Sequence, residues 1–470
     1  MRWACIVLPQ LALDGVLRAQ EIGDAPLAMI TGGAQRRLLQ AVNVPARQRG
    51  LRPGMTLTAA QALVRDFIRV EYDTREIERS ERLLAAWAYR FSSHVSLFYP
   101  RTLLLEVESS LALFGPWPRF EARLRQELTD LGFRHRIVVA PNPVAARVLA
   151  NVHDGLVVDE QSLLETLMPL SLERLGLPRD AARSCQRMGI RTLRQLLALP
   201  RAGLAKRFTA EVLLQLDRLL GQQPIALDYF LPPERFEQRL EFNFDVESNQ
   251  ALLFPLRRLC ADLAAFLHGR DCGVERFVLH MEHRSAADSR LDVGLLSPER
   301  ESERLFELAR ARLERLQLPS ATQALRLVAE DLPVFVPERR ELFDDRPQRS
   351  LVWQQLRERL RARLGEEAVL ALHARDDHRP EHAWRLATEN GSGSHASVAQ
   401  RPGWLLPQAK QLKENEVRIL GGPERIESGW WDADDIRRDY FLIETRSGQQ
   451  GWAYRAFGEA GPLMLQGWFA

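Results

Sequence analysis

The sequence predicts an α+β protein of about three domains, and three observations support this prediction. The first 151 residues alternate short apolar runs with amphipathic helical segments. Residues 170–222 contain short helical segments separated by glycine and proline, and residues 235–335 return to an alternation of strands and helices. A length of 470 residues fits about three domains at roughly 150 residues each. The 46% hydrophobic and 27% charged composition is ordinary for globular protein and excludes a collagen-like or largely disordered chain.

In the N-terminal part, the apolar runs have the length of buried strands, and the helical segments repeat apolar residues every three or four positions. An apolar stripe beginning at Leu11 predicts a helix directly after the first strand. We expect a mostly antiparallel sheet. Its strands are predicted at 3–8, 27–31, 95–99, 102–108 and 136–140, and further helices at 76–91, 118–131 and 143–151.

The segment 170–222 is predicted to be helical, with tight turns at 175–178 and 187–190. Turns of this kind between helices can present backbone N–H groups to a phosphate. A plain helical subdomain with no such role fits the same residues equally well.

Pro232 and Pro233 indicate a linker, after which a compact βαββαβ-like module is predicted. A strand begins near 235 and is followed by a helix at 250–268, strands at 274–283 and 290–296, a helix at 298–316 and a strand at 323–330.

The last 118 residues differ in character because they hold seven of the ten tryptophans. A helix at 351–364 is expected to be either core-facing or partner-docking, since its apolar residues form one stripe: Trp353, Leu356, Leu360 and Leu364. A flexible linker is expected at 390–403 and a small β unit from 416 onward, with a hairpin at 447–451.

Charge and cysteine content narrow the class of protein. The formal net charge is +2, so a nucleic-acid-binding face has to be local, although all but three of the 64 basic residues are arginine. The four cysteines form no C-x-x-C pair, which argues against a zinc ribbon or a disulfide framework. No secretion signal and no apolar run of about 18 residues is found, so we expect a cytoplasmic protein without a membrane partner.

Four segments, in the same order along the chain, resemble parts of the Y-family translesion DNA polymerases. Residues 45–55 (PARQRGLRPGM) are similar to the family's finger motif, and residues 139–147 (VAPNPVAAR) to its palm motif. The turns at 175–190 resemble its thumb, and 235–335 resembles its little finger. The resemblance implies a right-hand fold, with palm and fingers at 1–168 (fingers about 22–75), thumb at 169–230 and little finger at 235–335. These names are used below for these ranges.

The C-terminal region, 336–470, narrows the resemblance further. Residues 401–406 (RPGWLL), 422–431 (GPERIESGWW) and 437–440 (RRDY) are similar to the tail of the ImuB group. These are Y-family relatives regarded as non-catalytic adaptors of inducible, SOS-type mutagenesis.

The chemistry of nucleotidyl transfer is missing from the matched positions. The reaction needs two divalent metals held by carboxylates. The family's D-x-D falls on Leu8 and Gln10, and Tyr99-Pro100-Arg101-Thr102 replaces its S-x-D-E. An apolar side chain cannot bind Mg²⁺, and an arginine would repel it. The resemblance therefore implies no catalytic residue, no metal and no cofactor, with Leu8, Gln10, Arg101 and Thr102 at the lost carboxylate positions.

Two other groups of residues offer metal ligands. Asp14, Glu106 and Glu108 lie near the lost positions in sequence, so an active polymerase with relocated ligands is the alternative function. Asp376, Asp377, His378 and His382 also gather in one segment, where capping and solvation are the default interpretation.

A scaffold without metals can still bind a duplex through phosphate contacts, which position the DNA without reading its sequence. Of the family's nucleotide grip, Arg47 and Asn142 are kept. The predicted DNA-binding residues are Arg47, Gly176, Arg187, Gly189, Arg191, Arg207, Arg257, Arg258 and Arg276.

The segment Arg339-Arg340-Glu341-Leu342-Phe343 resembles the Q-x-x-L-F peptides that bind the bacterial sliding clamp. We expect Leu342 and Phe343 to be the clamp anchors, with Arg339 in the place of the glutamine. Packing of both side chains on the little finger is the alternative.

The resemblance implies an adaptor in translesion synthesis after DNA damage. Its expected partners are primer-template DNA, the sliding clamp, an error-prone DnaE-type polymerase (ImuC) and a RecA-like accessory protein (ImuA). A structural hub that no longer contacts DNA is a third hypothesis, and it predicts no salt-dependent duplex binding.

Overall fold

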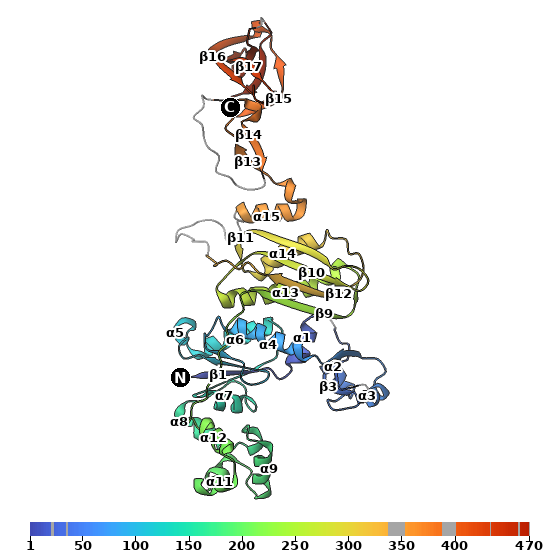
Figure 1. Ribbon diagram of the computed structural model, residues 1–470, viewed down its shortest axis with the longest axis vertical. Helices are drawn as coiled ribbons and strands as arrows, with labels where there is room; N and C mark the ends of the chain where they lie inside the picture. The colour runs from blue at the N-terminus through green and yellow to red at the C-terminus, as the bar shows by residue number, and fades with distance from the viewer. Residues whose placement is uncertain are drawn as a thin grey trace. The chain divides into compact units, whose positions relative to one another are not determined.

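The computed structural model of the protein describes residues 1–19, 23–33, 36–336, 353–387, 401–432, 434–458 and 461–469. The chain divides into two compact units, Met1–Arg359 and Leu360–Ala470. In Figure 1 the first unit runs from blue to yellow-orange and the second from orange to red. Both units contain sheets, and helices cover those of the first unit, so the predicted α+β class is confirmed.

The palm is a five-stranded sheet covered on both faces. Its order is β5-β6-β1-β7-β8, and every pairing is antiparallel except that of β7 with β8. All five residues of the central strand are buried, as expected for a continuous apolar run between two layers. The strands are β1 (Trp3–Val7), β5 (Val95–Ser96), β6 (Thr102–Glu106), β7 (Arg136–Ala140) and β8 (Leu156–Val157).

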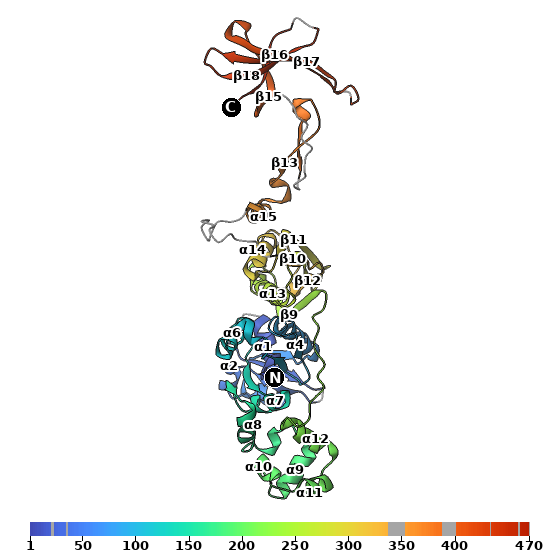
Figure 2. The same ribbon diagram turned by 90° about the vertical axis from the view of Figure 1, so that its left-hand side faces the viewer.

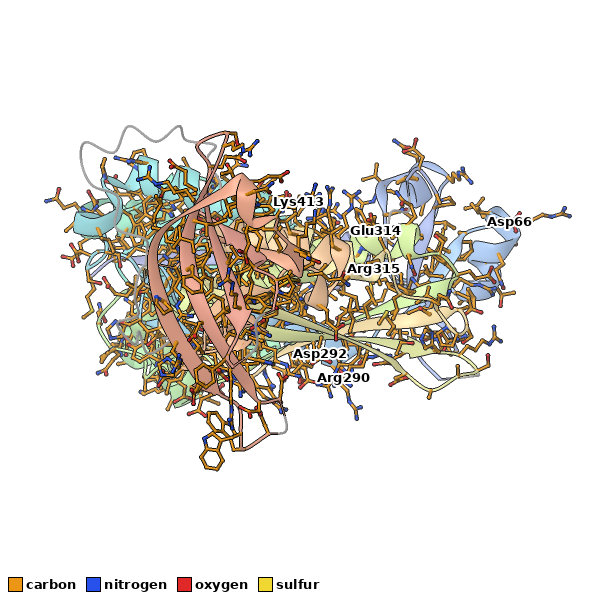
Figure 3. The ribbon with its side chains drawn as sticks, turned by 90° about the horizontal axis from the view of Figure 1, so that it is seen from above. Asp66, Arg290, Asp292, Glu314, Arg315 and Lys413 are labelled. Carbon is orange, nitrogen blue, oxygen red and sulfur yellow. The ribbon has the colours of Figure 1, made fainter. Side chains whose placement is uncertain are left out.

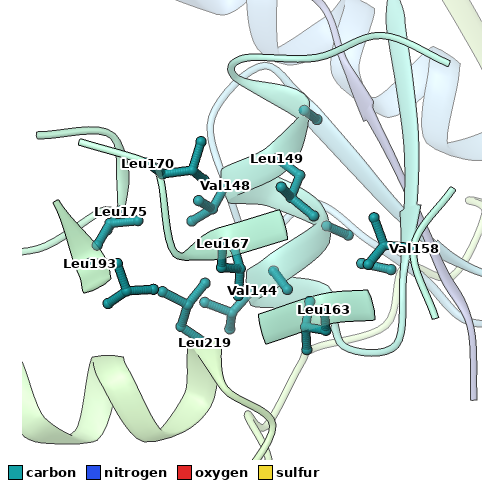
Figure 4. Close-up of a cluster of buried hydrophobic side chains, with 14 of the residues drawn as sticks. Val144, Val148, Leu149, Val158, Leu163, Leu167, Leu170, Leu175, Leu193 and Leu219 are labelled. Carbon is teal, nitrogen blue, oxygen red and sulfur yellow. The ribbon is translucent and has the colours of Figure 1, made fainter. Parts of the chain in front are cut away.

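Figure 1 shows α4 and α6 on one side of β1 and α7 on the other, and Figure 2 shows the same layers after a quarter turn. One layer packs Trp87 and Phe120 against Ile6 and Leu8, and the other packs α7 against Cys5. Figure 4 shows how this second core extends to Leu219 of the thumb. The palm helices are α1 (Leu11–Ala19), α4 (Thr74–Ala88), α5 (Leu111–Phe114), α6 (Trp117–Asp130), α7 (Pro143–Ala150) and α8 (Glu160–Leu167).

The fingers contain elements that the sequence pattern did not predict. Only the strand at 27–31 was expected, whereas a three-stranded sheet of order β3-β2-β4 carries two short helices. Asn43 begins the first of these helices by accepting a hydrogen bond from the N–H of Ala46 at 2.9 Å. The elements are β2 (Leu27–Thr31), β3 (Leu38–Val42), β4 (Ile68–Glu71), α2 (Val44–Gln48) and α3 (Leu57–Leu63).

The thumb is helical, as predicted. Its helices are short, and all but α11 are followed within three residues by a glycine or a proline. Their leucines join the core beneath α7. They are η1 (Leu172–Arg174), α9 (Arg179–Arg187), α10 (Leu193–Leu197), α11 (Arg201–Arg207) and α12 (Ala210–Leu219).

The little finger has the predicted βαββαβ element order. Its antiparallel sheet has the order β11-β10-β12-β9, and alternate residues such as Phe277, Leu279 and Met281 are buried on the face that its two helices cover. The elements are β9 (Phe236–Val246), α13 (Asn249–Arg270), β10 (Val274–His283), β11 (Ser289–Glu299), α14 (Ser302–Leu313) and β12 (Thr322–Ala329).

A buried ion pair joins the little finger to the palm. Arg18 of α1 and Asp262 of α13 are 5% and 1% exposed, and Arg18 Nη1 donates to Asp262 Oδ2 at 3.0 Å. Arg18 Nε also donates to the carbonyl of Leu131 at 2.8 Å, and its guanidinium lies 4.6 Å from the ring centre of Phe133. Burial raises the pKa of Asp262, and the charge of Arg18 opposes this rise.

The same contact brings α13 against α4. A Cβ added at Gly269 would lie 2.0 Å from the carbonyl oxygen of Ala86, so the two helices approach at a distance that only glycine allows.

Helix α15 (Trp353–Leu364) forms as predicted, and two leucines of its apolar stripe are exposed. Leu356 and Leu364 are 37% and 60% exposed, whereas Arg357, Glu358 and Arg361 are buried. Glu358 accepts hydrogen bonds from the N–H of Leu296 and from Arg304, at 2.6 and 3.1 Å. Polar pairing of Glu358, and not burial of Leu356 or Leu364, thus directs the described face of this helix, and the choice between a core-facing and a partner-docking stripe stays a prediction.

The second unit contains a hairpin and a five-stranded antiparallel sheet of order β15-β19-β18-β17-β16, including the predicted turn at Gly448. Tyr440 and Trp452 stack at 3.9 Å in its core. The strands are β13 (Ala371–Ala374), β14 (Trp384–Ala387), β15 (Trp404–Gln411), β16 (Val417–Ser428), β17 (Ile436–Thr445), β18 (Gln450–Ala456) and β19 (Met464–Trp468).

The possible metal cluster in this unit is organised around an arginine. Arg379 is 1% exposed and donates to both oxygens of Asp377 at 3.0 and 2.9 Å, and to those of Asp432 at 2.9 and 2.6 Å. The hydrogen bonds from Arg379 lower the pKa of Asp377 to about 2. His382 Nε2 lies 2.8 Å from Asp434 Oδ2. A guanidinium therefore occupies the centre of the acidic groups, where a metal was the other possibility.

Candidate nucleic-acid interface

The positions of the missing carboxylates come together in the palm. The N–H of Leu8, which follows β1, donates to the carbonyl of Arg101 at 2.9 Å, and Val7 pairs with Thr102 across the sheet. Leu8 and Thr102 are fully buried, and the Thr102 hydroxyl donates to the carbonyl of Pro100 at 3.1 Å. The side chains that meet here are thus one apolar group and one satisfied hydroxyl, neither of which is a Mg²⁺ ligand of the kind the reaction needs.

Gln10, at the other lost position, begins the turn into α1. Its amide oxygen is buried and has no hydrogen-bond partner among the residues that the structure describes. Arg101 has a φ of +52°, a backbone conformation that non-glycine residues rarely adopt, and its N–H donates to Glu81 at 2.6 Å.

The three nearby carboxylates have separate partners. Asp14 accepts from the N–H of Arg134 at 3.0 Å and from its guanidinium at 2.7 Å, while burial raises the pKa of Asp14. Glu106 pairs with Trp3, which lies five residues from Leu8, or about 16 Å along an extended chain. Its carboxylate accepts from the N–H of Glu108 at 2.9 Å, and Glu108 itself binds the amino group of Met1 at 2.8 Å.

These carboxylates do not converge on Leu8. Among the residues that the structure describes, no group of three or more His, Cys, Asp or Glu side chains is arranged to hold a metal ion.

In the fingers, Arg47 lies on α2 with an exposed side chain that has no hydrogen-bond or ion-pair partner in the described part of the chain. Asn142 has a structural role. It caps α7 by accepting from the N–H of Ala145 at 2.8 Å, and its amide donates to the carbonyl of Leu219 at 3.2 Å. The residue that resembles part of a nucleotide grip therefore ties the palm to the thumb.

The predicted thumb residues lie on one run of turns and helix ends. Gly176 and Gly189 have φ of +72° and +80°, which allows the tight turns before α9 and α10. Arg187 and Arg191 flank the second turn with exposed side chains, and Arg207 Nη1 donates to the sulfur of Met188 at 2.9 Å.

The thumb holds the local basic excess that the balanced whole-chain charge conceals. Residues 169–230 contain ten Arg or Lys and five Asp or Glu. All of them are described, and one ion pair lies within the range, between Arg201 and Asp217 at 2.5 Å.

The three predicted little-finger arginines have intramolecular partners. Arg257 pairs with Glu303 and its guanidinium lies 4.2 Å from the ring centre of Phe306. Arg258 donates to the carbonyl of Asp130 in the palm at 3.0 Å, and Arg276 pairs with Asp292 at 2.5 Å. Contact of these arginines with DNA stays a prediction, and it would require them to exchange these partners.

The open face of the little-finger sheet carries a row of basic residues that the sequence analysis missed. Arg290 lies opposite His280, His280 opposite Arg326, and Arg326 opposite Arg239, so the row crosses all four strands. Burial, followed by the charges of Arg326 and Arg290, lowers the pKa of His280. The strand register reveals this row, whereas the residues are far apart in sequence.

Acidic residues neutralise this row. Arg239 pairs with Glu282 at 2.8 Å, Arg326 with Glu237 at 3.4 Å, and Arg290 with Asp292 at 2.9 Å. Figure 3 shows Arg290 and Asp292 together on the sheet. The predicted clamp anchors Leu342 and Phe343, with Arg339, lie outside the described residues.

Comparisons with known proteins agree with the resemblance seen in the sequence. Residues 15–151 match the impB/mucB/samB family. The chain is also similar to Protein ImuB of Caulobacter vibrioides, from strain NA1000 and from strain ATCC 19089. Each is 26% identical over 444 residues, which cover 86% of this chain and 96% of the relative. The chain is an ImuB homologue.

Solved structures of Y-family polymerases are also similar to this ImuB homologue. A Y-family DNA polymerase chimera aligns with a TM-score of 0.41 and 14% identity, over 71% of this chain and all of that chain. DinB from Sulfolobus solfataricus aligns with a TM-score of 0.39 and 15% identity, over 72% of this chain and all of that chain. Within the described residues, no helix has the length and apolar character to cross a membrane.

Proposed function

We propose that this ImuB homologue is a non-catalytic adaptor in translesion DNA synthesis and damage-induced mutagenesis. The observation that carries the proposal is the meeting of Leu8 with Arg101 and Thr102 at the end of β1 and β6. Polymerase chemistry needs two metals held by carboxylates at such a site. A palm with a buried leucine and threonine there keeps the scaffold and lacks the ligands.

The adaptor holds primer-template DNA chiefly through the thumb. Exposed arginines without acidic partners bind phosphates by releasing counterions, and the basic excess of residues 169–230 supplies them. At the second turn the N–H groups of Gly189 and Ile190 donate to the carbonyls of Gln186 and Cys185 at 2.9 and 3.0 Å, so phosphate contact there falls to the side chains of Arg187 and Arg191.

Its protein partners, by resemblance to ImuB, are the sliding clamp, the error-prone DnaE-type polymerase ImuC and the RecA-like protein ImuA. Leu342 and Phe343 are the proposed clamp anchors. The C-terminal region offers exposed apolar side chains for the other two partners, since Trp404, Trp430 and Trp431 are 70%, 78% and 59% exposed.

Primer extension with Mg²⁺ or Mn²⁺ tests the proposal when duplex binding is measured in the same samples. We expect salt-dependent binding and no added nucleotide. Extension that disappears in Glu106→Gln or Glu108→Gln would establish the alternative, an active polymerase with relocated ligands. Asp159→Asn is the matched control, because this carboxylate caps α8 far from β1 in sequence. Absence of duplex binding would instead favour a hub that does not contact DNA.

Clamp binding has its own test. Replacing Leu342 and Phe343 by Ala should weaken clamp binding by about tenfold or more, because two apolar anchors leave their pocket. Duplex affinity should be unchanged in the same variant. Surface plasmon resonance on immobilised clamp measures the first quantity, and unaltered clamp affinity would remove these residues from the interface.

A further inference from the structure

The fingers carry a hollow that the DNA-binding surface does not use. Its volume is about 510 Å³, and it lies where α2, α3 and the start of β4 meet. Arg49, Arg65 and Arg69 line it together with Asp66, and the buried Pro26 and half-buried Phe67 contribute apolar surface.

The three arginines are available for binding. Each side chain is exposed, and none has a hydrogen-bond or ion-pair partner within the described part of the chain. The surrounding charge does not neutralise them, because residues 23–72 hold seven arginines and three acidic residues. One of those acids, Glu71, already pairs with Arg37. An arginine fork binds carboxylate or phosphate through two hydrogen bonds, so the hollow selects an anionic ligand.

An exposed leucine lies beside the hollow. Leu63 at the end of α3 is 54% exposed, and its Cδ2 would lie 3.0 Å from a Cβ added at Gly50, the residue after Arg49. A large apolar side chain at the edge of a cationic hollow favours a ligand that brings its own apolar group.

The hollow is separate from the predicted DNA contact of the fingers. Arg47 and Arg49 are two residues apart at α2, which places their side chains about 200° apart around the helix. Arg47 is also not among the residues that line the hollow, so the two arginines serve different sides of α2. Asp66 also favours a peptide over a nucleic acid as the ligand of the hollow. Its carboxylate repels a continuous polyanion, whereas it can accept a hydrogen bond from a donor group of a peptide. Figure 3 shows Asp66 at the outer edge of the fingers.

We propose that this hollow is a docking site for an acidic segment of a partner protein. Asp or Glu side chains of that segment pair with Arg49, Arg65 and Arg69, and an apolar side chain packs beside Leu63. The site rests on the proposed adaptor function and deepens it by giving the chemistry of one partner segment, and it needs neither DNA nor the clamp.

Fluorescence anisotropy with a labelled acidic peptide tests the proposal on the full chain. The probe is an octapeptide of six Asp or Glu residues with one Leu and one Phe, and its partner probe has Ser in place of Leu and Phe. A single-stranded oligonucleotide and a primer-template duplex are measured alongside. The test variant is Arg49→Ser with Arg65→Ser and Arg69→Ser. The matched control is Arg187→Ser with Arg191→Ser and Arg207→Ser, which removes the same number of exposed arginines from the thumb.

We expect the fingers variant to raise the Kd of the apolar-containing peptide by about tenfold or more and to leave duplex affinity unchanged. The thumb variant should do the reverse, so failure of DNA binding and failure of this site are distinguishable. Leu63→Ser should weaken the first peptide and not the Ser-containing one.

Three results would overturn the proposal. The first is peptide binding that is absent, or equal in the fingers variant and the unaltered protein. The second is equal affinity for both peptides, which would reduce the effect to general charge attraction. The third is loss of oligonucleotide affinity in the fingers variant, which would make the hollow a nucleic-acid surface instead.

Discussion

The thumb and the little finger use the same residue type in different ways. The thumb has ten basic and five acidic residues and one internal ion pair. The little finger has fourteen arginines and seventeen acidic residues, and at least ten of those arginines form ion pairs. Arginine is thus a free cation in one region and a structural cross-link in the other.

This difference bears on how a nucleic-acid surface is recognised. A free arginine gains a phosphate and releases counterions, whereas a paired arginine must first lose its carboxylate. The number of arginines in a region is therefore a poor predictor of nucleic-acid binding. The local balance between arginines and acidic residues is a better one. Removing arginines should cost DNA affinity in the thumb and stability in the little finger.

The largest effect is expected at the buried pair between Arg18 and Asp262. Replacing Arg18 by Ala leaves a carboxylate that is 1% exposed without its partner, which should lower the free energy of unfolding by about 3–5 kcal/mol. Urea denaturation of the full chain measures this. Arg18→Met combined with Asp262→Leu should recover most of the loss, because an apolar pair needs no partner charge. A loss below about 1 kcal/mol in Arg18→Ala would mean that the pair does not hold the little finger to the palm.

The next effect concerns DNA binding by the thumb. The Arg187→Ser, Arg191→Ser, Arg207→Ser variant should lose about tenfold to a hundredfold in duplex affinity at about 0.1 M salt. The slope of log K against log salt should fall by about 0.9 for each phosphate contact removed. Thermal stability should hardly change, since the side chains are exposed. Titrations at several salt concentrations measure the affinity and the slope, and an unchanged slope would exclude these arginines as phosphate contacts.

A smaller effect is expected on the open face of the little finger. Replacing Arg276, Arg290 and Arg326 by Ser removes as many charges as the thumb variant, but each is paired with an acidic residue. Duplex affinity should therefore fall by less than about threefold under the same conditions. If duplex affinity fell as much as in the thumb variant, the thumb and the little finger would not differ as argued above. Such a result would show that these ion pairs exchange readily for phosphate.

The smallest effect is expected on the pH dependence of stability, and it involves Arg379. Among the arginines described in the C-terminal region, Arg379 is the most completely paired. Its hydrogen bonds lower the pKa of Asp377 to about 2 from the ordinary 3.8. A carboxylate with a lowered pKa stabilises the folded state above its ordinary pKa, and this stabilisation is lost as the pH falls through the folded value. Stability should thus be constant for this group from pH 7 to about 4 and decline toward pH 2.

Tryptophan fluorescence is the appropriate measurement for that decline, since Trp431 lies 5.7 Å from the guanidinium of Arg379. Asp377→Asn should be less stable at pH 7, and the difference from the unaltered protein should shrink below pH 4 and be lost as the pH falls through about 2. The Asp154→Asn variant is a control, because Asp154 also has a lowered pKa but belongs to the first unit.

Much of the fold could be predicted from the sequence, for reasons that differ by region. Long periodic segments such as α4, α6 and α13 were found because their apolar repeat spans several turns. The fingers were not, since α2 has five residues and β4 has four, which is too short for a period to be recognised. The capping Asn43 and Pro45 in the first turn are the local signals of α2.

The site was predicted unevenly. Alignment with family motifs led to Leu8, Arg101 and Thr102, and the structure brings these positions together. The roles of individual arginines could not be predicted, because Arg258 and Arg276 find partners 128 and 16 residues away in sequence. The buried face of helix α15 could not be predicted for the same reason. It is set by the pairing of Glu358 with Arg304, a residue distant in sequence.

The burial of Leu8 also restricts how such a palm can evolve. An aspartate at that position alone would be fully desolvated without a metal, and a metal cannot bind until a second carboxylate replaces Thr102. A single carboxylate introduced at Leu8 or at Thr102 is therefore expected to be destabilising, and only the two together could hold a metal. On the proposed non-catalytic function, the absence of metal ligands at these two positions is thus hard to reverse one residue at a time.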